Sequence, residues 1–461
     1  MRARLAARSS IHQRVRVHQP TAPVEISNRG LFAGVTPYHW LVVVIASCGW
    51  LFDCMDQRIF ILAREPALRE LLGTDPQAAA QLKTVGGYAT TSMILGWATG
   101  GIIFGMMSDR LGRVKTMVIT LLVYSGFTGL SGMATSWVDF TVYRFLVGLG
   151  VGGMFGAATT LVAESVPGQF RAVALGSLQA LSALGNIIGS LASLMIPPGA
   201  VAFAAGYSGW RVLFFVGIVP SILIVPIMFV LKEPDSWLRA RADAAAGRSS
   251  GKSIGSPAEL FRHPRWRHNT IVGLLLGVSG MIGLWGIGFF SPELISTALR
   301  GEAQPVVDRV RALGTALQDV GSFFGMMTFT LIASFLSRRL AFLIALLLSM
   351  MVTMFVFASL QSASDAYWML PMMGFAQLGV FACYSIYFPE LFPTRLRGTG
   401  VGFCYNTVRY LAAPGPIVFG YLATLMSFRS AAVLMSTIYL VGVVTLIWAP
   451  ETYGTPLPED E

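Results

Sequence analysis

Several ionisable side chains lie inside long apolar stretches of this sequence, where a charge is costly to keep. Asp53 and Asp56 stand three residues apart in one stretch, Arg144 lies in a second and Arg409 in a third. A charged side chain at the centre of a bilayer costs about 2.5–3.5 kcal/mol on insertion scales. Residues with such a cost usually face a cavity or an ionic partner, so these four are the first candidates for chemistry.

The two aspartates predict a proton-binding site. A spacing of three residues places both carboxylates on one face of a helix. Two like charges held close together in a low dielectric favour retention of a proton, which makes Asp53 or Asp56 a proton carrier. The alternative is a pair of acids near the outer membrane surface that Arg58 neutralises.

Arg409 is a candidate anion-binding residue. It follows Gly398 by eleven positions, so a helix that starts there carries it about 16 Å into the membrane, near the midplane. A guanidinium presents a planar fork of donors that matches a carboxylate. The alternative is that Arg409 is a structural partner of another polar group.

The composition indicates a membrane protein. Of the 461 residues, 54% are apolar and 12% are charged, whereas soluble globular proteins carry about 25% charge. Disorder is excluded, because it requires low hydrophobicity and high net charge. The four cysteines form no C-x-x-C pair and the five histidines have no metal-ligand spacing, so we expect no metal and no cofactor. The net charge of +10 fits basic cytoplasmic loops rather than nucleic-acid binding.

The elements that position these residues are predicted to be transmembrane helices. Apolar runs of about 20 residues can cross a bilayer core of about 30 Å as helices, whereas isolated strands would leave backbone groups unpaired in lipid. The sequence therefore predicts an all-α membrane protein with twelve transmembrane helices in two six-helix halves. The expected spans are 38–60, 85–107, 116–135, 139–163, 172–195, 211–231, 270–292, 314–336, 340–360, 366–388, 399–424 and 429–449.

The distribution of charge predicts the orientation. Most of the 33 Lys and Arg residues fall on one side of the spans, which the positive-inside rule assigns to the cytoplasm. Both termini are then cytoplasmic, in the inner membrane if the source is bacterial. The expected parts are a basic tail (1–36), an N-terminal six-helix half (37–231), a cytoplasmic linker (232–269), a C-terminal six-helix half (270–449) and a cytoplasmic tail (450–461).

An internal repeat relates the two halves. The segment from Glu164 to Arg171 reads E-S-V-P-G-Q-F-R, and the segment from Glu390 to Arg397 reads E-L-F-P-T-R-L-R, with Glu, Pro and Arg at the same spacing. A twofold repeat of six spans is typical of secondary transporters, whose binding site lies near the midplane between the halves. We expect these Glu and Arg residues to form salt bridges of a cytoplasmic gate.

The loop after the second span carries a specific motif. Residues 105–115 read G-M-M-S-D-R-L-G-R-V-K and resemble the signature G-x-x-x-D-R-x-G-R-[KR] of the major facilitator superfamily. The resemblance implies that the first glycine permits close helix packing, and that the acid sits at a neighbouring helix N-terminus beside an Arg and holds the cytoplasmic side shut. The alternative is basic residues that only set topology. The gate candidates from this motif are Gly105, Asp109, Arg110, Gly112 and Arg113.

Further segments resemble branches of the same superfamily. The D-x-x-D of the first span is similar to the D-G-x-D of aromatic-acid:proton symporters, and the context of Arg409 is similar to the eleventh span of organic-anion transporters. Proton-coupled sugar porters pair a first-span Asp with a fourth-span Arg, which implies a titratable pair of Asp56 and Arg144. The ending from Pro450 resembles the P-E-T-K-G of sugar porters, although Tyr453 replaces the Lys.

Other polar and aromatic residues in the spans are candidates to line the substrate cavity with Arg409. They are Gln179, Asn186, Trp285, Gln377, Tyr384 and Asn406.

These features predict a secondary active transporter that works by alternating access, and not an enzyme. We expect proton symport of a small organic anion: a monocarboxylate, an aromatic acid or a sugar acid. The alternative substrate is a neutral sugar or polyol, and a transport-like receptor is a further alternative. The expected partners are the substrate, protons and membrane lipid, and we expect a monomer.

Overall fold

The computed structural model describes residues 31–73, 76–201, 203, 206–246, 253–412, 418–419, 421–422 and 425–459. The first thirty residues of the expected basic tail, and residues 247–252 of the expected linker, lie outside this described part of the chain.

The first half is built of long helices joined by short loops. Prolines stand in the first turn of several of them, where the missing amide hydrogen breaks no bond. The elements are α1 (Pro37–Leu72), α2 (Pro76–Leu111), α3 (Arg113–Ser131), α4 (Trp137–Ser165), α5 (Gly168–Met195), α6 (Gly209–Val216), the 3-10 turn η1 (Val219–Leu223) and α7 (Ile224–Val230).

Two short helices follow, and then the helices of the second half. The elements are α8 (Asp235–Ala245), α9 (Pro257–Arg262), α10 (Pro264–Gly286), η2 (Gly288–Phe290), α11 (Ser291–Ala298), α12 (Gln304–Phe335), α13 (Arg338–Ser359), α14 (Ala363–Glu390), α15 (Arg397–Ala412), α17 (Phe428–Met435), η3 (Ser436–Ile438) and α18 (Tyr439–Thr445).

The helices coincide with the expected spans. Eleven segments of the described chain are long and apolar enough to cross a membrane. The remaining expected span, 399–424, begins as α15, and part of it lies outside the described residues. Helix α1 continues past its apolar run to Leu72, and helix α12 starts ahead of its apolar run at Gln304. Apolar runs mark only the part of a helix that lipid or core covers, so these polar extensions carry no such signal.

The internal repeat extends to the helix termini. Ser136 and Asp139 form a capping box at the start of α4, and Ser362 and Asp365 form the same box at the equivalent position of the second half, the start of α14. A capping box satisfies two amide hydrogens that a helix start leaves free. The two halves therefore share local structure as well as sequence.

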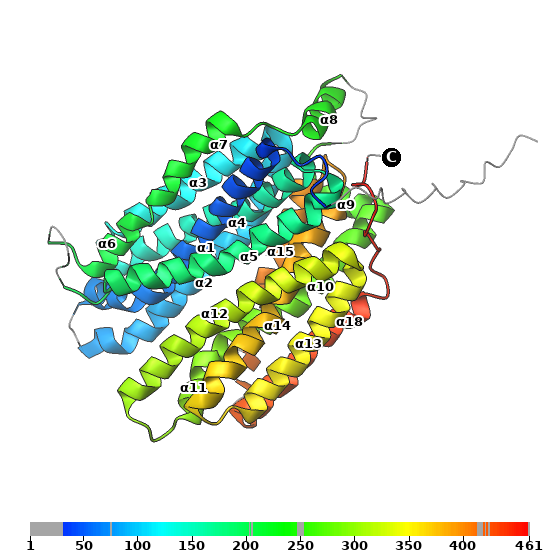
Figure 1. Cartoon of the computed structure of the whole chain (residues 1–461). Coiled ribbons are helices and arrows are strands. Elements are labelled where there is room, and N and C mark those ends of the chain that lie inside the picture. The colour runs from blue at the N-terminus through cyan, green and yellow to red at the C-terminus, as the bar shows by residue number, and fades with distance from the viewer. Residues whose placement is uncertain are drawn as a thin grey trace, which may run out of the picture.

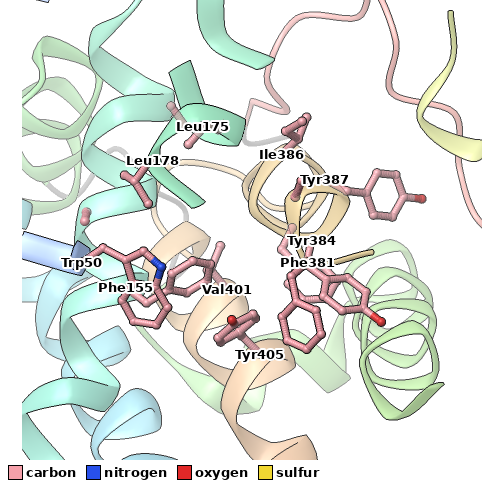
Figure 2. Packing of buried hydrophobic residues seen from close by; sticks show 14 of the residues in the cluster. Trp50, Phe155, Leu175, Leu178, Phe381, Tyr384, Ile386, Tyr387, Val401 and Tyr405 are labelled. Carbon is pink, nitrogen blue, oxygen red and sulfur yellow. The ribbon is translucent and has the colours of Figure 1, made fainter. Parts of the chain in front are cut away.

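The two halves lie side by side, with α1–α7 against α10–α18 (Figure 1). Across the boundary α5 packs against α12 and α14, and α2 packs against α15. Helices α8 and α9 and the C-terminus lie at one end of the bundle, and α6 and α11 lie toward the other. One apolar cluster crosses the boundary, and includes Phe155 and Leu175 of the first half and Phe381 and Tyr405 of the second (Figure 2).

Candidate functional site

Arg409 lies buried on α15 at the boundary between the halves. Its guanidinium carbon is 4.0 Å from the ring centroid of Trp97 on α2 and 5.0 Å from that of Tyr405. One terminal nitrogen lies 3.5 Å from the sulfur of Met281 on α10, and 3.4 Å from the Tyr405 carbonyl. The side chain is 4% exposed, and its Nε atom has no hydrogen-bond partner within the described residues.

Aromatic rings enclose this cation. Trp97 meets Trp285 edge-on, with 6.2 Å between ring centroids, and Tyr405 stacks on Phe155 at 4.0 Å. Figure 2 shows Phe155 and Tyr405 facing each other across the boundary between the halves. Within the described residues, no ion pair joins Arg409 to a carboxylate. The aromatic faces attract the cation but accept few of its hydrogen bonds.

Two of the predicted polar residues have partners near the boundary between the halves, and one of these partners belongs to the enclosure. Gln179 interacts with the hydroxyl of Tyr405. Asn186 interacts with the carboxylate of Asp319 on α12. Gln179 and Trp285 are thus the predicted cavity residues that the structure brings toward Arg409.

The other three predicted cavity residues are engaged in helix packing. Tyr384 donates to the Leu276 carbonyl (2.6 Å) and accepts from the Gly280 amide (3.1 Å). Gln377 donates to Thr353 on α13 (2.9 Å), and Asn406 donates to a carbonyl of its own helix, that of Gly402 (3.0 Å). A buried hydroxyl that both donates and accepts has its hydrogen bonds satisfied, so the prediction for Tyr384 is corrected here to a packing role.

Asp56 and Arg144 form a fully buried ion pair, 3.6 Å apart. Thr128 donates to Asp56 at 2.9 Å, and Arg144 donates to Ser131 at 2.7 Å. The guanidinium also lies 4.6 Å from the ring centroid of Phe214. The fourth-span Arg thus meets the second aspartate of the D-x-x-D motif.

Asp53 has a different environment. It is 1% exposed, and within the described residues neither of its carboxylate oxygens has a partner in good hydrogen-bonding geometry. The buried hydroxyl of Tyr124 on α3 is among its polar neighbours. A charged carboxylate here has no cationic partner among the described residues to offset its loss of water, whereas protonation removes that cost.

Arg58 does not neutralise these two acids, contrary to the alternative considered from sequence. Its guanidinium forms an ion pair with Asp319 on α12, in the other half of the molecule. Within the described residues, Asp56 is paired with Arg144 of α4, and neither aspartate is paired with Arg58.

At the other end of the bundle, Asp109 caps a helix of the opposite half. Its carboxylate accepts from the backbone amides of Gly398 (2.9 Å) and Thr399 (2.7 Å) at the start of α15, and from the Thr399 hydroxyl (2.6 Å). Arg113 lies 3.3 Å from the same carboxylate. A carboxylate at a helix N-terminus stabilises the helix dipole, so this contact ties the halves together.

Glu164 adds a second tie between the halves. Both of its oxygens accept from Arg113 at 3.0 Å, and it also pairs with Arg397 of the second half. The expected salt bridge of Glu164 is thus formed with Arg397, and not with Arg171, the nearer arginine in the chain. Arg171 lies in the first turn of α5 and donates to the Ala163 carbonyl instead (3.0 Å).

Glu390 is paired with Arg338, which was not among the expected gate residues. Arg338 donates to both of its oxygens at 2.9 and 3.1 Å, and Thr452 donates to it at 2.6 Å. The partners of Glu390 named here, Arg338 and Thr452, both belong to the second half. Arg397 instead pairs with Glu164 of the first half.

The glycines of the motif occupy crowded positions. A Cβ on Gly105 would lie 2.7 Å from the Gly398 carbonyl oxygen, so only glycine lets α2 approach α15 this closely. Gly112 has a φ of 115°, which favours glycine. Arg110 donates to the carbonyl of Ile254 in the linker (3.3 Å).

A family model described as Major Facilitator Superfamily matches residues 46–414. The chain belongs to the major facilitator superfamily. The family, the fold class of twelve helices in two halves, and transport of small molecules instead of enzymatic catalysis, all expected from the sequence, are thereby confirmed.

Relatives within the superfamily carry named substrates. The chain is 30% identical over 388 residues to the cis,cis-muconate transport protein of Acinetobacter baylyi, covering 82% of this chain and 89% of that protein. It is 29% identical over 398 residues to the sialic acid transporter NanX of Escherichia coli, covering 85% and 88%. The proton:xylose symporter XylE shares the fold, with a TM-score of 0.72, 17% identity and coverage of 91% of this chain and 98% of that one.

Two glutamates with matching roles escaped the sequence analysis. Glu233 accepts from the first backbone amides of α3, and Glu451 accepts from those of Arg338 and Arg339 at the start of α13. Burial raises the pKa of Glu233. Burial also acts on Glu451, but donors from Ser337 and backbone amides outweigh it and hold the pKa of Glu451 below its ordinary value.

The structure also reveals functional candidates that the sequence analysis did not select. Trp97 and Met281 contact Arg409, and Asp319 pairs with Arg58. Trp97 carried no charge to mark it, but Asp319 is an acid inside an expected span, 314–336, and the criterion that selected Asp53 would have selected it too. Within the described residues, no group of three His, Cys, Asp or Glu side chains is placed to hold a metal ion.

Proposed function

We propose that this member of the major facilitator superfamily is a proton-coupled symporter of small organic anions. The substrate site lies around Arg409, between the two halves, and alternating access exposes it to each side of the membrane in turn. Acceptance of a carboxylate is the feature that separates this function from transport of a neutral sugar or polyol.

The observation that carries the proposal is the state of Arg409. An ionised group in a dry interior is costly unless it is paired, and the Arg409 guanidinium has a free Nε and no acidic partner within the described residues. A substrate carboxylate can supply that charge through two parallel hydrogen bonds. The rings of Trp97, Tyr405 and Trp285 offer flat apolar surfaces for the rest of the substrate.

The names of the relatives support the same class. Muconate and sialic acid are both carboxylic acids, although one is an unsaturated diacid and the other a sugar acid. A shared carboxylate is what an arginine between the halves recognises, and the residues around it then discriminate among acids.

Proton coupling is assigned to the cluster on α1. Asp53 carries the proton, because within the described residues it is buried without a cation to stabilise its charge. Asp56 stays paired with Arg144, and their pair links α1 to α4. A change of charge at Asp53 then alters the packing of α1 against its neighbours, which biases the two conformations differently.

The gate and the membrane topology complete the proposal. Asp109, Arg113, Glu164 and Arg397 hold the cytoplasmic end shut in this conformation. Both termini and the linker are cytoplasmic, the boundaries of the halves are those expected from sequence, the membrane is the inner one in a bacterium, and the protein transports as a monomer.

The test is a thermal-shift comparison of matched ligands on the purified protein. Benzoate and benzamide have the same shape and differ in charge. A ligand that binds the folded state raises the melting temperature, so benzoate and cis,cis-muconate should stabilise the protein, and benzamide and glucose should not. Loss of a charge-assisted bond of about 1.5–3 kcal/mol should weaken anion binding about 10- to 150-fold in Arg409→Gln, with partial retention in Arg409→Lys.

Arg69→Gln serves as the matched control, because Arg69 pairs with the exposed Glu65 on its own helix. It should keep the full response to benzoate. Stabilisation by glucose alone, or an undiminished benzoate response in Arg409→Gln, would contradict the proposed substrate class.

A further inference from the structure

Arg58 of α1 and Asp319 of α12 form an ion pair between the two halves. This pair lies far from the end of the bundle where Asp109 and its partners join the halves. That end of the bundle also holds Pro37, at the start of α1, and Phe335, at the end of α12. At helical rise, Arg58 lies about 31 Å from Pro37 along α1, and Asp319 lies about 24 Å from Phe335 along α12. The pair therefore joins the two halves nearer the opposite end of the bundle.

Residues of α5 pack beside the Arg58–Asp319 pair. A Cβ on Gly189 of α5 would lie 2.9 Å from the Arg58 Cβ, so the absence of a side chain lets α5 pack tightly beside it. Asn186, on the same helix, interacts with the Asp319 carboxylate. The side chains of Arg58 and Asp319 are 20% and 16% exposed, so the pair is largely shielded from water.

We infer that the Arg58–Asp319 pair is an outer latch. It holds the halves together on the outer side of the substrate site, as Asp109 and the Glu164–Arg397 pair hold them on the cytoplasmic side. Since the halves move apart at one side during each half-cycle, one set must break while the other stays closed. The relative strength of the two sets then decides which side the empty protein opens to. This inference rests on the alternating access and orientation proposed above.

Cys54 is a native reporter for this movement. It lies one helical turn before Arg58, is 7% exposed, and interacts with the charges of Arg58, Asp319 and Arg409. Opening the outer side exposes it to water. Cys383 and Cys404 are 1% and 0% exposed in the core of the second half, and report general unfolding.

The experiment measures labelling of Cys54 by a membrane-impermeant thiol reagent in right-side-out and inverted vesicles, with peptide mass spectrometry as the readout. Arg58→Gln and Asp319→Asn should each accelerate labelling from the outer side about fivefold or more, as expected for loss of the one ion pair that joins the halves there. The two substitutions change the local charge in opposite directions, so a pure charge effect on thiol reactivity would move the two rates oppositely.

Two further variants protect the test against misfolding. Asp319→Glu keeps the charge and should keep the original rate, and the exchanged variant R58D/D319R should restore it. Glu65→Gln, which breaks the exposed Arg69–Glu65 pair on the same helix, should leave it unchanged. Faster labelling of Cys383 or Cys404 identifies an unfolded variant. In that case the labelling rate of Cys54 in R58D/D319R is the test, and a restored wild-type rate supports the latch.

The outcomes separate this inference from the proposed function. Weakening the cytoplasmic latch with Asp109→Asn should slow outer labelling of Cys54. If Asp109→Asn changes labelling while Arg58→Gln and Asp319→Asn do not, the outer latch is wrong and alternating access stands. If the two rates move in opposite directions, the latch is also wrong. If the variants accelerate labelling only in inverted vesicles, the latch stands and the orientation is reversed.

Discussion

At the scale of single residues, the chemistry depends on which buried charges have partners. Asp56 has Arg144, Arg58 has Asp319 and Glu164 has two arginines. Arg409 and Asp53 lack such an ionic partner within the described residues. Paired charges hold helices in place, and under the proposed function the two unpaired groups bind an anion and a proton.

The two aspartates of α1 should respond differently to removal of charge. Asp56→Asn leaves Arg144 buried without its counter-ion, which costs about 3–5 kcal/mol, and should lower the melting temperature. Asp53→Asn removes a group that has no ionic partner to lose, so it should melt near the wild-type temperature. It should still exchange substrate across the membrane but fail to accumulate it with a proton gradient.

Thermal melts and paired exchange and accumulation assays check this prediction. The double variant D56N/R144Q should recover part of the stability lost in Asp56→Asn, because the unpaired cation is gone. Full proton-driven accumulation by Asp53→Asn would rule out Asp53 as the carrier.

Sequence could identify Arg409, Asp53 and Asp56 because each is a charge inside an apolar run. It could not choose between the two aspartates, since only the fold shows that Arg144 meets Asp56. It also predicted salt bridges among Glu164, Arg171, Glu390 and Arg397 without their pairing, and the structure joins Glu164 to Arg113 and Arg397. Pairings between distant helices depend on packing that a linear pattern does not contain.

At the scale of elements, small residues set how closely α2 and α15 approach. A Cβ on Gly402 would lie 2.3 Å from the Gly101 carbonyl oxygen, and one on Gly105 would lie 2.7 Å from that of Gly398. The apolar runs predicted which segments are helices and the repeat predicted their pairing into halves. The polar extensions of α1 and α12 were not predicted, because polar helical turns resemble loops in composition.

Gly402→Ala tests this close contact. The added methyl must push α2 and α15 apart, and overpacking costs about 1–3 kcal/mol, so the melting temperature should fall. Gly126→Ala is the matched control, because a Cβ at Gly126 of α3 meets nothing within 4 Å. Its melting temperature should stay equal or rise through helix propensity. Equal melting of both variants would show that the contact is looser than described.

The capping role of Glu451 at the start of α13 predicts a pH-dependent contribution to stability. Its folded-state pKa lies below the ordinary value of 4.5, so its carboxylate contributes stability above the unfolded-state pKa and loses it as pH falls through the folded-state pKa. The melting-temperature difference between wild type and Glu451→Gln should therefore be largest near neutral pH and shrink as pH falls below about 4.5. A difference that is constant over this range would contradict the cap.

At the scale of the whole molecule, the halves are tied together at the end of the bundle that carries Asp109, which we propose is the cytoplasmic end. Asp109 and Glu164, from the first half, bind the start of α15 in the second half. These contacts come from a superfamily motif and from the repeat that relates Glu164 to Glu390, so the sequence predicted their place. Their strength comes from burial, since water does not screen a pair with no exposed side-chain surface.

Glu164→Gln should loosen this end of the molecule. Spin labels at Lys115 and Arg339, exposed at the starts of α3 and α13, report the separation of the halves there. Double electron–electron resonance should show a longer distance in Glu164→Gln than in wild type, and no change in Glu259→Gln, whose partner is Arg395 near the linker. Unchanged distances in Glu164→Gln would remove Glu164 from the gate.

The most direct test of the central claim is uptake of labelled benzoate into proteoliposomes under an inward proton gradient. Wild-type protein should accumulate benzoate against its gradient, and Arg409→Gln should lose both accumulation and exchange while Arg69→Gln keeps both. Accumulation by Arg409→Gln at the wild-type rate would contradict the assignment of Arg409 as the anion-binding residue.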